Sequence, residues 1–275
     1  MITNHKDYDV CIVGSGPAGA FAAHEIAKSG INVALVEAGG SNLDVRTENI
    51  LDEEKSNIKG DVNFGFSQQI GGSSNLWSGG LAQFYPIDMM ERKQFGFEGW
   101  PIDNKELSTL YLRVNKIIGI SGAHQDHDTL KKDLISFLNT SSIEAREMMV
   151  LDKPFCTSHL IEKFKGIKLF SKCMVRKFNM NKNKISSIEV FDIKEQKQFN
   201  LVAKRYILAA GALTNIRLML YSLEKYKNQF EDLYSNVGLN FSTHPKANVG
   251  YIKLFKPLSP NHPFLKYKRL DGYIS

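Results

Sequence analysis

A glycine-rich turn placed between apolar segments constrains this chain more than any other feature of its sequence. Residues 8–13, Tyr-Asp-Val-Cys-Ile-Val, predict a short buried strand, and residues 20–29 predict an alanine-rich helix that ends at Gly30. A second apolar run covers residues 31–36 and ends at Glu37. The turn between the first strand and the helix consists of Gly14, Ser15, Gly16, Pro17, Ala18 and Gly19.

Each glycine of this turn has a physical role in binding a dinucleotide. Gly14 permits the tight turn, Gly16 lets a pyrophosphate approach the backbone, and Gly19 lets the helix pack closely on the strand. Pro17 suits the first helical turn, where the N–H that it lacks would have no partner inside the helix. The free N–H groups and the positive end of the helix would then face the phosphates.

The acidic residue at the end of the second apolar run completes the pattern. Glu37 lies 18 residues after Gly19, where its carboxylate can accept hydrogen bonds from ribose hydroxyls and disfavours a 2′-phosphate. An isolated glycine pattern is a weak signal, and an ordinary glycine turn of an α/β protein is the alternative. The strand, helix and acid around the turn favour the dinucleotide site, but they do not distinguish NAD from FAD.

A second segment rich in glycine and serine follows at residues 64–80. Its composition argues against a regular helix or strand and predicts a tight loop whose N–H and O–H groups face a ligand. A flexible linker is the alternative, but Leu76, Trp77 and Leu81 would be poorly placed in a solvated linker. The central residues of this predicted loop are Gly71, Gly72, Ser73, Ser74 and Asn75.

Composition narrows the class of protein. A hydrophobic content of 43% and a charged content of 23% are ordinary for a globular chain, and 275 residues suffice for one large or two small domains. The net charge of +6 is spread along the chain, so we interpret it as solvated lysines, and no nucleic-acid module is recognisable. The N-terminus lacks the apolar core of a signal peptide and no run reaches membrane-spanning length, so a cytoplasmic location is expected.

Cysteine and histidine residues suggest two further sites, neither of which we favour. The chain has three cysteines, which are Cys11, Cys156 and Cys173. Their spacing predicts neither a disulfide framework nor a zinc site. Residues 124–128, His-Gln-Asp-His-Asp, offer metal ligands, but we interpret them as a polar loop between helices and expect no metal. A nucleophile and base at Cys156 and His159 are conceivable, yet Thr157 and Ser158 are expected to cap a helix that runs to about residue 165.

The middle of the chain predicts helices. Residues 86–95 predict a short helix, and Asp103 is predicted to cap a longer helix that stops at Gly119. A further helix is expected at residues 128–138, where four apolar residues share one face.

The later part of the chain predicts strands. Four short segments predict a small antiparallel meander at residues 167–170, 174–178, 185–191 and 199–202. Residues 206–212 then predict a buried strand that runs into Gly211, followed by a helix at residues 213–223. This is a second strand–glycine–helix element, which a plain NAD-binding domain does not need. Another strand is expected at residues 247–255.

Four segments, in this order and spacing, resemble the glucose–methanol–choline (GMC) family of FAD-dependent oxidoreductases. Two of them are the first glycine turn with Glu37 and the loop of residues 71–75. The other two are residues 209–212, Ala-Ala-Gly-Ala, and residues 237–245, which end in His-Pro. Together they span about residues 8–245.

The resemblance implies that the cofactor is FAD rather than NAD. It places Glu37 on the adenosine ribose, the first glycine turn on the pyrophosphate and the backbone of Val175 on the adenine. The loop of residues 71–75 would lie against the flavin ring and the pyrophosphate. The second strand–glycine–helix element would add Ala210 and Gly211 to the cofactor site.

The resemblance also implies a reaction, the oxidation of a primary or secondary alcohol. A base removes the hydroxyl proton while hydride passes from carbon to flavin N5. Trp100-Pro101 and the helix at residues 106–111 resemble the sugar-oxidising bacterial branch, so a sugar-like alcohol is expected. Asn75 stands where some relatives carry a histidine linked to FAD, and because asparagine cannot make that bond we predict non-covalent FAD. The family's base lies beyond the end of this chain and His244 matches an earlier position, so the catalytic residues stay unknown.

These features together predict an α/β fold, a Rossmann-like FAD-binding domain with an inserted antiparallel meander, a helical insertion and an incomplete substrate-domain sheet. We expect the FAD-binding domain at residues 1–95 and 165–243, the helical insertion at residues 96–164 and the start of a truncated substrate domain at residues 244–275. One alternative is a non-catalytic flavin-binding fragment, or a subunit of a split enzyme that a second polypeptide completes. Another is an NAD-linked dehydrogenase, against which the loop of residues 71–75 and the second strand–glycine–helix element argue.

Overall fold

The chain folds into two compact units. The computed structural model describes residues 3–43, 67–120, 149–151, 153–162, 166–239, 241, 269–270 and 273–274. The first unit comprises Met1–Leu76 and Cys156–Pro245, and the second comprises Trp77–Phe155 and Lys246–Ser275. The assignment of parts of the chain to FAD-binding, insertion and substrate domains stays a prediction.

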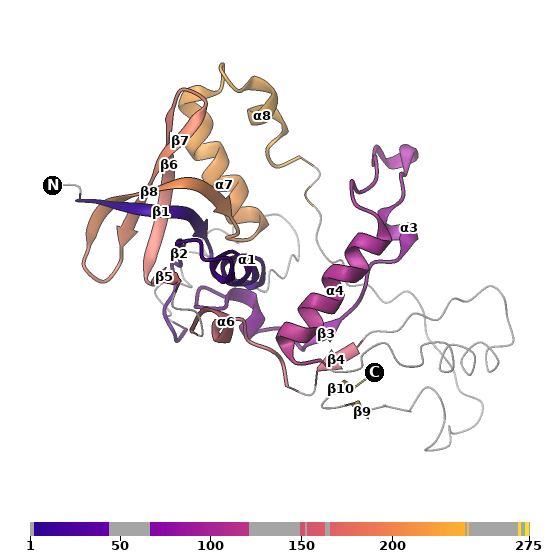
Figure 1. Cartoon of the computed structure of the whole chain (residues 1–275). Coiled ribbons are helices and arrows are strands. Elements are labelled where there is room, and N and C mark those ends of the chain that lie inside the picture. The colour runs from indigo at the N-terminus through magenta and orange to yellow at the C-terminus, as the bar shows by residue number, and fades with distance from the viewer. Residues whose placement is uncertain are drawn as a thin grey trace, which may run out of the picture. The chain divides into compact units, whose positions relative to one another are not determined.

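A six-stranded sheet forms the centre of the first unit (Figure 1). Its order is β5-β2-β1-β8-β7-β6. The strands are β1 (Thr3–Val13), β2 (Val33–Val36), β5 (Ile167–Phe170), β6 (Cys173–Asn181), β7 (Lys184–Asp192) and β8 (Lys197–Leu208). The strands β5, β2, β1 and β8 are parallel, whereas β7 and β6 extend the sheet antiparallel. The predicted α/β fold class, with an antiparallel meander added to a Rossmann-like sheet, is confirmed.

The apolar runs of β1 and β2 are explained by their central place in this sheet. Each of these strands has a parallel neighbour on both sides, and helices cover a parallel sheet on both faces, so the strands read as continuous apolar sequence. Cys11 and Ala34 join Leu218 of α7 (Ala212–Leu223) in the larger core cluster. Ile12 and Leu35 are also fully buried and alternate with them, so they face the opposite side.

Helix α1 (Pro17–Lys28) follows β1 directly and contacts β1, β2 and β5. Gly16 is its N-cap and Pro17 occupies the first turn, as the sequence predicts. Its buried residues are all small, namely Gly19, Ala20, Ala23 and Ala27. Because these residues bring the helix axis close to the sheet, the N-terminus of α1 is held next to the ends of β1 and β2.

Two predictions about the strands are wrong in detail. Residues 167–170 are not part of the antiparallel meander, because β5 pairs parallel with β2 in the register Val33↔Ile167 to Val36↔Phe170. The segment predicted at residues 199–202 and the start of the one predicted at residues 206–212 belong to a single strand, β8, which ends at Leu208 and pairs with β1 from Phe199 onward. The polar residues Lys204 and Arg205 suggest a break in sequence, but both are exposed and leave the backbone pairing intact.

The first unit ends in helices that follow β8. Helix α7 agrees with the helix predicted at residues 213–223, and Leu218 and Leu223 bury it against the meander. The short helix η3 (Glu224–Tyr226) and α8 (Glu231–Asn236) follow it. Helix α6 (Ser158–Glu162) also belongs to this unit and contacts α1.

The second unit contains a small sheet and the longest helix of the described chain. Its strands are β3 (Gly80–Leu81), β4 (Met149–Leu151), β9 (Arg269–Leu270) and β10 (Tyr273–Ile274), in the order β3-β4-β10-β9. Its helices are α3 (Pro86–Met89), η2 (Lys93–Phe95) and α4 (Asn104–Ile118). The segment predicted as one helix at residues 86–95 is thus two short helices. The predicted start and stop of α4 are confirmed, since Asp103 accepts a hydrogen bond from the Glu106 N–H at 2.7 Å and Gly119 is the C-cap.

Several predictions fall outside the described residues. They concern the helix at residues 128–138, the polar segment at residues 124–128, the strand at residues 247–255, and His244. Among the residues that the structure describes, no helix is long and apolar enough to cross a membrane.

Candidate functional site

A cavity of about 530 Å³ opens at the carboxyl ends of β1, β2 and β8 in the first unit. This volume lies within the range that small-molecule and cofactor sites usually occupy, about 300–1,000 Å³. Ligands of open α/β sheets bind at the carboxyl ends of the strands, where the first helix begins. Ten of the residues predicted as cofactor-binding line it, namely Gly14, Gly16, Pro17, Ala18, Glu37, Gly72, Ser73, Val175, Ala210 and Gly211.

Two glycines of the first turn are required by the packing of the protein itself. Gly14 has φ of +98°, and a Cβ at this position would lie 2.5 Å from the Ala209 carbonyl oxygen. A Cβ on Gly19 would lie 1.9 Å from the carbonyl oxygen of Gly14. Both distances are far below van der Waals contact, so any side chain at Gly14 or Gly19 would force the backbone of the turn to move.

Gly16 differs from these two glycines, because nothing in the protein requires it to lack a side chain. Its φ of −62° suits any residue, and a Cβ would meet only the Gly72 Cα, at 3.9 Å. Gly16 lines the cavity at the N-terminus of α1. A side chain here would therefore fill cavity space beside the free N–H groups of the helix, where an anion binds well.

Glu37 is held in place by three hydrogen bonds within the protein. The N–H and the hydroxyl of Ser15 both donate to its Oε2, at 2.9 and 2.7 Å, and the Gly39 N–H donates to Oε1 at 2.8 Å. Glu37 is only 7% exposed and still lines the cavity. A carboxylate has about four lone-pair sites, so one on Oε1 is left for a ligand. Ser15, which is fully buried, binds Glu37 and does not line the cavity.

The loop of residues 71–75 contains the short helix η1 (Gly72–Asn75) and lies directly against the first turn. A Cβ on Gly72 would be 2.7 Å from the Gly16 Cα, so the two backbones are in contact. The Gly71 N–H donates to the Ser15 hydroxyl at 3.2 Å. Sequence reasoning gives this loop a place beside the ligand, and Gly72 and Ser73 do line the cavity. Gly71, Ser74 and Asn75 instead hold the loop together.

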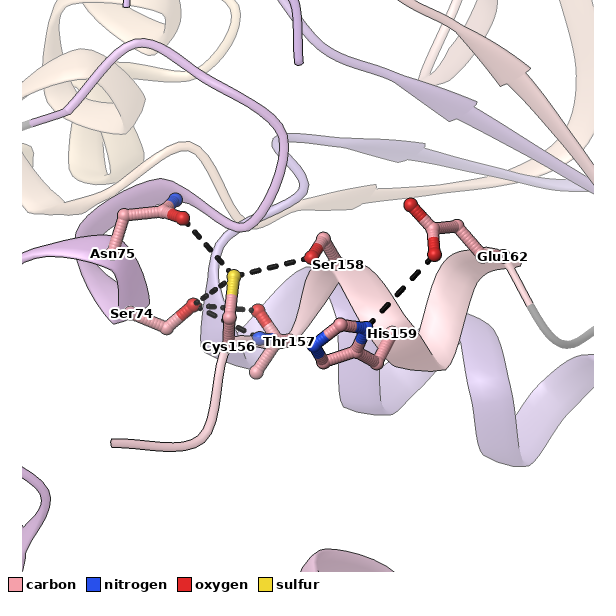
Figure 2. Close-up of polar contacts among 7 residues, drawn as sticks. All are labelled: Ser74, Asn75, Cys156, Thr157, Ser158, His159 and Glu162. Carbon is pink, nitrogen blue, oxygen red and sulfur yellow. Dashed lines mark hydrogen bonds and ion pairs between the residues drawn. The ribbon is translucent and has the colours of Figure 1, made fainter. Parts of the chain in front are cut away.

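Figure 2 shows how the segment that precedes α6 meets this loop. The Thr157 N–H donates to the Ser74 hydroxyl at 3.0 Å, and the Cys156 thiol donates to Asn75 Oδ1 at 3.0 Å. Ser158 Oγ also lies 3.1 Å from the Cys156 sulfur, whereas the His159 ring is directed toward Glu162, 3.9 Å away. The thiol and the imidazole of Cys156 and His159 are therefore engaged with different partners.

The second strand–glycine–helix element forms the opposite wall of the cavity. Ala209, Ala210 and Gly211 connect β8 to α7, and all three line the cavity. Asn215, in the first turn of α7, fixes this connection. Its Oδ1 accepts from the Ala210 N–H at 3.0 Å, and its Nδ2 donates to the Leu208 carbonyl at 3.3 Å.

Five polar residues of the cavity were not found by sequence reasoning, namely Ser67, Gln68, Thr214, Asn215 and Arg217. Within the part of the chain that the structure describes, the Ser67 hydroxyl is buried and has no hydrogen-bond partner. Partial burial lowers the pKa of the Arg217 guanidinium from its usual value, but arginine stays charged in proteins, so its side chain places a cation in the wall of the cavity. Their sequence neighbourhood gives no signal, because the fold alone brings them to the cavity.

The cysteines and the described metal-ligating residues offer no second centre. Burial raises the pKa of the Cys11 thiol to about 12, and burial with the nearby charge of Asp192 raises that of Cys173 to about 11. Both thiols therefore stay protonated near neutral pH, and all three cysteines are free. Among the described residues, no group of three or more histidine, cysteine, aspartate and glutamate side chains is arranged to hold a metal ion.

Comparison with known proteins identifies the family. A sequence model described as pyridine nucleotide-disulphide oxidoreductase matches residues 8–247, which include both strand–glycine–helix elements and the loop between them. The chain belongs to the pyridine nucleotide-disulphide oxidoreductase family. The match covers the dinucleotide-binding elements of the chain, and all three cysteines are free.

One curated relative and several solved structures are similar to parts of this chain. A curated relative, 2-methyl-1,2-propanediol dehydrogenase from Mycolicibacterium austroafricanum, is 27% identical over 44% of this chain and 26% of its own length. Pyridoxine 4-oxidase from Mesorbium loti has a TM-score of 0.50 at 18% identity, over 78% of this chain and 52% of its own. An FAD-dependent oxidoreductase from Chaetomium thermophilum has a TM-score of 0.53 at 13% identity, over 82% and 49%.

A further solved structure is similar to this chain in fold. A formate oxidase from Aspergillus oryzae RIB40 has a TM-score of 0.52 at 17% identity, over 80% of this chain and 48% of its own. The resemblance to the GMC family drawn from the sequence is confirmed at the level of the fold. The chain spans about half the length of these solved structures and about a quarter of the curated relative.

Proposed function

We propose that this chain is the FAD-binding portion of an oxidoreductase that oxidises a CH–OH group of a sugar or a similar alcohol. The environment of Gly16 carries the proposal. Neither its φ nor the packing around it requires glycine, yet it lines the cavity at the N-terminus of α1. A ligand whose phosphate contacts this backbone gives a physical reason for the missing side chain.

The residues of the cavity fit the parts of FAD. The N–H groups at the start of α1, beside Gly16, would hold the pyrophosphate. The free lone pair of Glu37 would accept a hydrogen bond from the adenosine ribose, and the backbone of Val175 would contact the adenine. Gly72 and Ser73 would face the flavin side of the pyrophosphate, because their backbone already touches Gly16.

Two polar residues that sequence reasoning did not find support an anionic, hydroxyl-rich ligand. Arg217 adds a cation to the wall of the cavity, which suits a pyrophosphate. The buried hydroxyl of Ser67, which has no partner among the described residues, would gain one from a ribityl, ribose or phosphate oxygen. An unsatisfied buried hydroxyl costs about 1–3 kcal/mol, so a ligand that satisfies it binds more tightly.

FAD, when bound, supplies the acceptor for the hydride that leaves the alcohol carbon. The described residues contribute the binding and the orientation of this cofactor, and the base that removes the hydroxyl proton is not assigned to any of them. We propose that FAD is bound non-covalently. The Asn75 amide supports this, since its Nδ2 donates to Ile70 and Gly72 carbonyls at 3.1 and 2.8 Å and an amide nitrogen is not a nucleophile.

A second candidate function is a flavin-binding fragment or subunit without its own activity, completed by a second polypeptide. The cavity supports it, because its lining residues suit the binding of a cofactor and no described residue is assigned as the base. An NAD-linked dehydrogenase is less well supported. The loop of residues 71–75 contacts the first turn and lines the cavity, and binding the adenosine half of a dinucleotide does not require this loop.

The absorbance spectrum of the purified full chain, before and after addition of FAD, tests these proposals. Flavin bands that bleach anaerobically with a panel of sugars and alcohols would support the complete activity. Flavin bands without bleaching would support the binding subunit. A chain that binds NAD but takes up no FAD would refute both.

Denaturation of the flavin-loaded chain tests non-covalent binding. It should release free FAD into the filtrate, and flavin that stays with the polypeptide would contradict non-covalent binding.

A further inference from the structure

A buried hydrogen-bond network links the segment before α6 to the acid of the cavity. It runs from Thr157 to Ser74, from there to Gly71, then to Ser15 and finally to Glu37. Thr157, Ser74 and Ser15 are 2%, 3% and 0% exposed. These hydroxyls bond to one another, to the Gly71 backbone and to Glu37, so the loss of one hydroxyl takes a hydrogen bond from its buried partners.

Thr157 is the member of this network that lies in the segment before α6, and Figure 2 shows its contacts with Ser74. Its N–H donates to the Ser74 hydroxyl at 3.0 Å, its Oγ1 lies 3.0 Å from the same hydroxyl, and its Oγ1 donates to the Gly71 carbonyl at 3.3 Å. The Ser74 hydroxyl also donates to the Gly71 carbonyl, at 2.6 Å. Thr157 therefore forms hydrogen bonds with Gly71 and Ser74, the residues at the two ends of the turn that carries Gly72.

These contacts lie where the chain leaves the first unit and where it returns to it. The first unit ends after Leu76 and resumes at Cys156. The contacts of Ser74 and Asn75 with Thr157 and Cys156 join the outgoing and returning segments within the first unit. The loop is thus fixed on one side by Thr157 and on the other by its contact with the first turn, and not by a regular sheet.

We infer that Thr157 is a positioning residue of the cofactor site, which holds the backbone of Gly71 and Gly72 against Gly16. The inference rests on the proposed function, since the position of Gly72 matters for a ligand whose pyrophosphate lies on Gly16. Thr157 itself does not line the cavity, so its effect on a ligand would be indirect, through the position of this loop. Nothing in the sequence around Thr157, beyond a helix cap, points to this role.

Thr157→Val tests the inference, because valine has the shape of threonine without its hydroxyl. We expect the Kd for FAD to rise about tenfold, which is equivalent to about 1.4 kcal/mol. Thr157→Ser keeps the hydroxyl and should restore the Kd to within about twofold of the unchanged chain. Hydrogen exchange of the amides of residues 71–75 should be faster in the valine variant, in the absence of FAD, and normal in the serine variant.

Ser222→Ala is the matched control for a loss of stability alone. Ser222 is a buried residue of α7 whose hydroxyl accepts from the Phe178 N–H at 3.0 Å, and it does not line the cavity. This variant should lower the thermal midpoint as Thr157→Val does, but leave the Kd and the exchange of residues 71–75 unchanged. An equal Kd for Thr157→Val and the unchanged chain, or equal weakening in both variants, would overturn the inference. Failure of the unchanged chain to bind FAD would refute the proposed function instead, and the exchange measurement would still test the loop.

Discussion

The two strand–glycine–helix elements of the first unit have similar sequences but different physical reasons for their glycines. At the first element, Gly14 and Gly19 allow backbone segments to approach closely. A Cβ on Gly14 would lie 2.5 Å from the Ala209 carbonyl oxygen, and a Cβ on Gly19 would lie 1.9 Å from the Gly14 carbonyl oxygen. At the second, a Cβ on Gly211 would meet nothing within 4 Å, but its backbone has φ of +84° and ψ of 158°, a region almost restricted to glycine. Asn215 holds the second connection through its side chain.

A glycine in a motif can thus serve the fold, the backbone conformation or a ligand. Gly19 serves the fold, Gly211 serves the backbone conformation, and Gly16 is proposed to serve the ligand. Substitutions at these positions should therefore separate stability from binding, and the contrast between them is more informative than any one of them.

Gly19→Ala should have the largest effect. Its new methyl group would lie 1.9 Å from the Gly14 carbonyl oxygen, so α1 must move away from the turn. We expect the free energy of unfolding to fall by about 3 kcal/mol or more, measured by urea denaturation. Gly16→Ala is the control and should lose less than about 1 kcal/mol, because a Cβ fits there. Equal losses in the two variants would show that the two glycines do not differ.

Gly16→Val should have the largest effect on binding. A branched side chain at the N-terminus of α1 would occupy the cavity where the pyrophosphate is proposed to lie. We expect FAD affinity to fall by more than about a hundredfold, or about 2.7 kcal/mol, in a fluorescence titration. Gly30→Ala, at the other end of α1 and open to solvent space, is the control and should leave the affinity unchanged. Full flavin occupancy in the valine variant would remove the main support for the proposed cofactor site.

Gly211→Ala should have an intermediate effect on stability. Alanine fits the space but is strained in this backbone region, so we expect a loss of about 2 kcal/mol in the free energy of unfolding. Thermal unfolding without FAD measures it. If the loss matched that of Gly19→Ala, packing would have to explain both positions and the contrast between the two elements would fail.

Asn215→Ala should have the smallest effect. It removes the hydrogen bonds to the Ala210 N–H and the Leu208 carbonyl, which costs about 1 kcal/mol at this half-buried site. Urea denaturation of Asn215→Ala beside Asn215→Asp, which keeps the acceptor of the Ala210 N–H, separates the two bonds. No change in either variant would mean that the second connection, like the first, is held by its backbone.

Much of the first unit could be predicted because its signals are local. The apolar runs of β1 and β2, the glycine turn and the small residues of α1 each encode their own element. In the second unit, the start of α4 after Asp103 and its end at Gly119 likewise follow from capping chemistry that involves only neighbouring residues. The pairing of β5 with β2 could not be predicted, since a four-residue segment does not reveal whether its partner strand is parallel.

The candidate site divides in the same way. The sequence by itself determined the glycine turns, the acid at Glu37 and the loop of residues 71–75, because each depends on residue types at short spacing. Only the tertiary structure decided that Ser15 binds Glu37, that Thr157 holds the loop and that Ser67 and Arg217 reach the cavity. Ser15 and Glu37 are 22 positions apart in the sequence, and Ser74 and Thr157 are 83 positions apart. A hydrogen bond over such a separation forms only after the fold has brought both partners together.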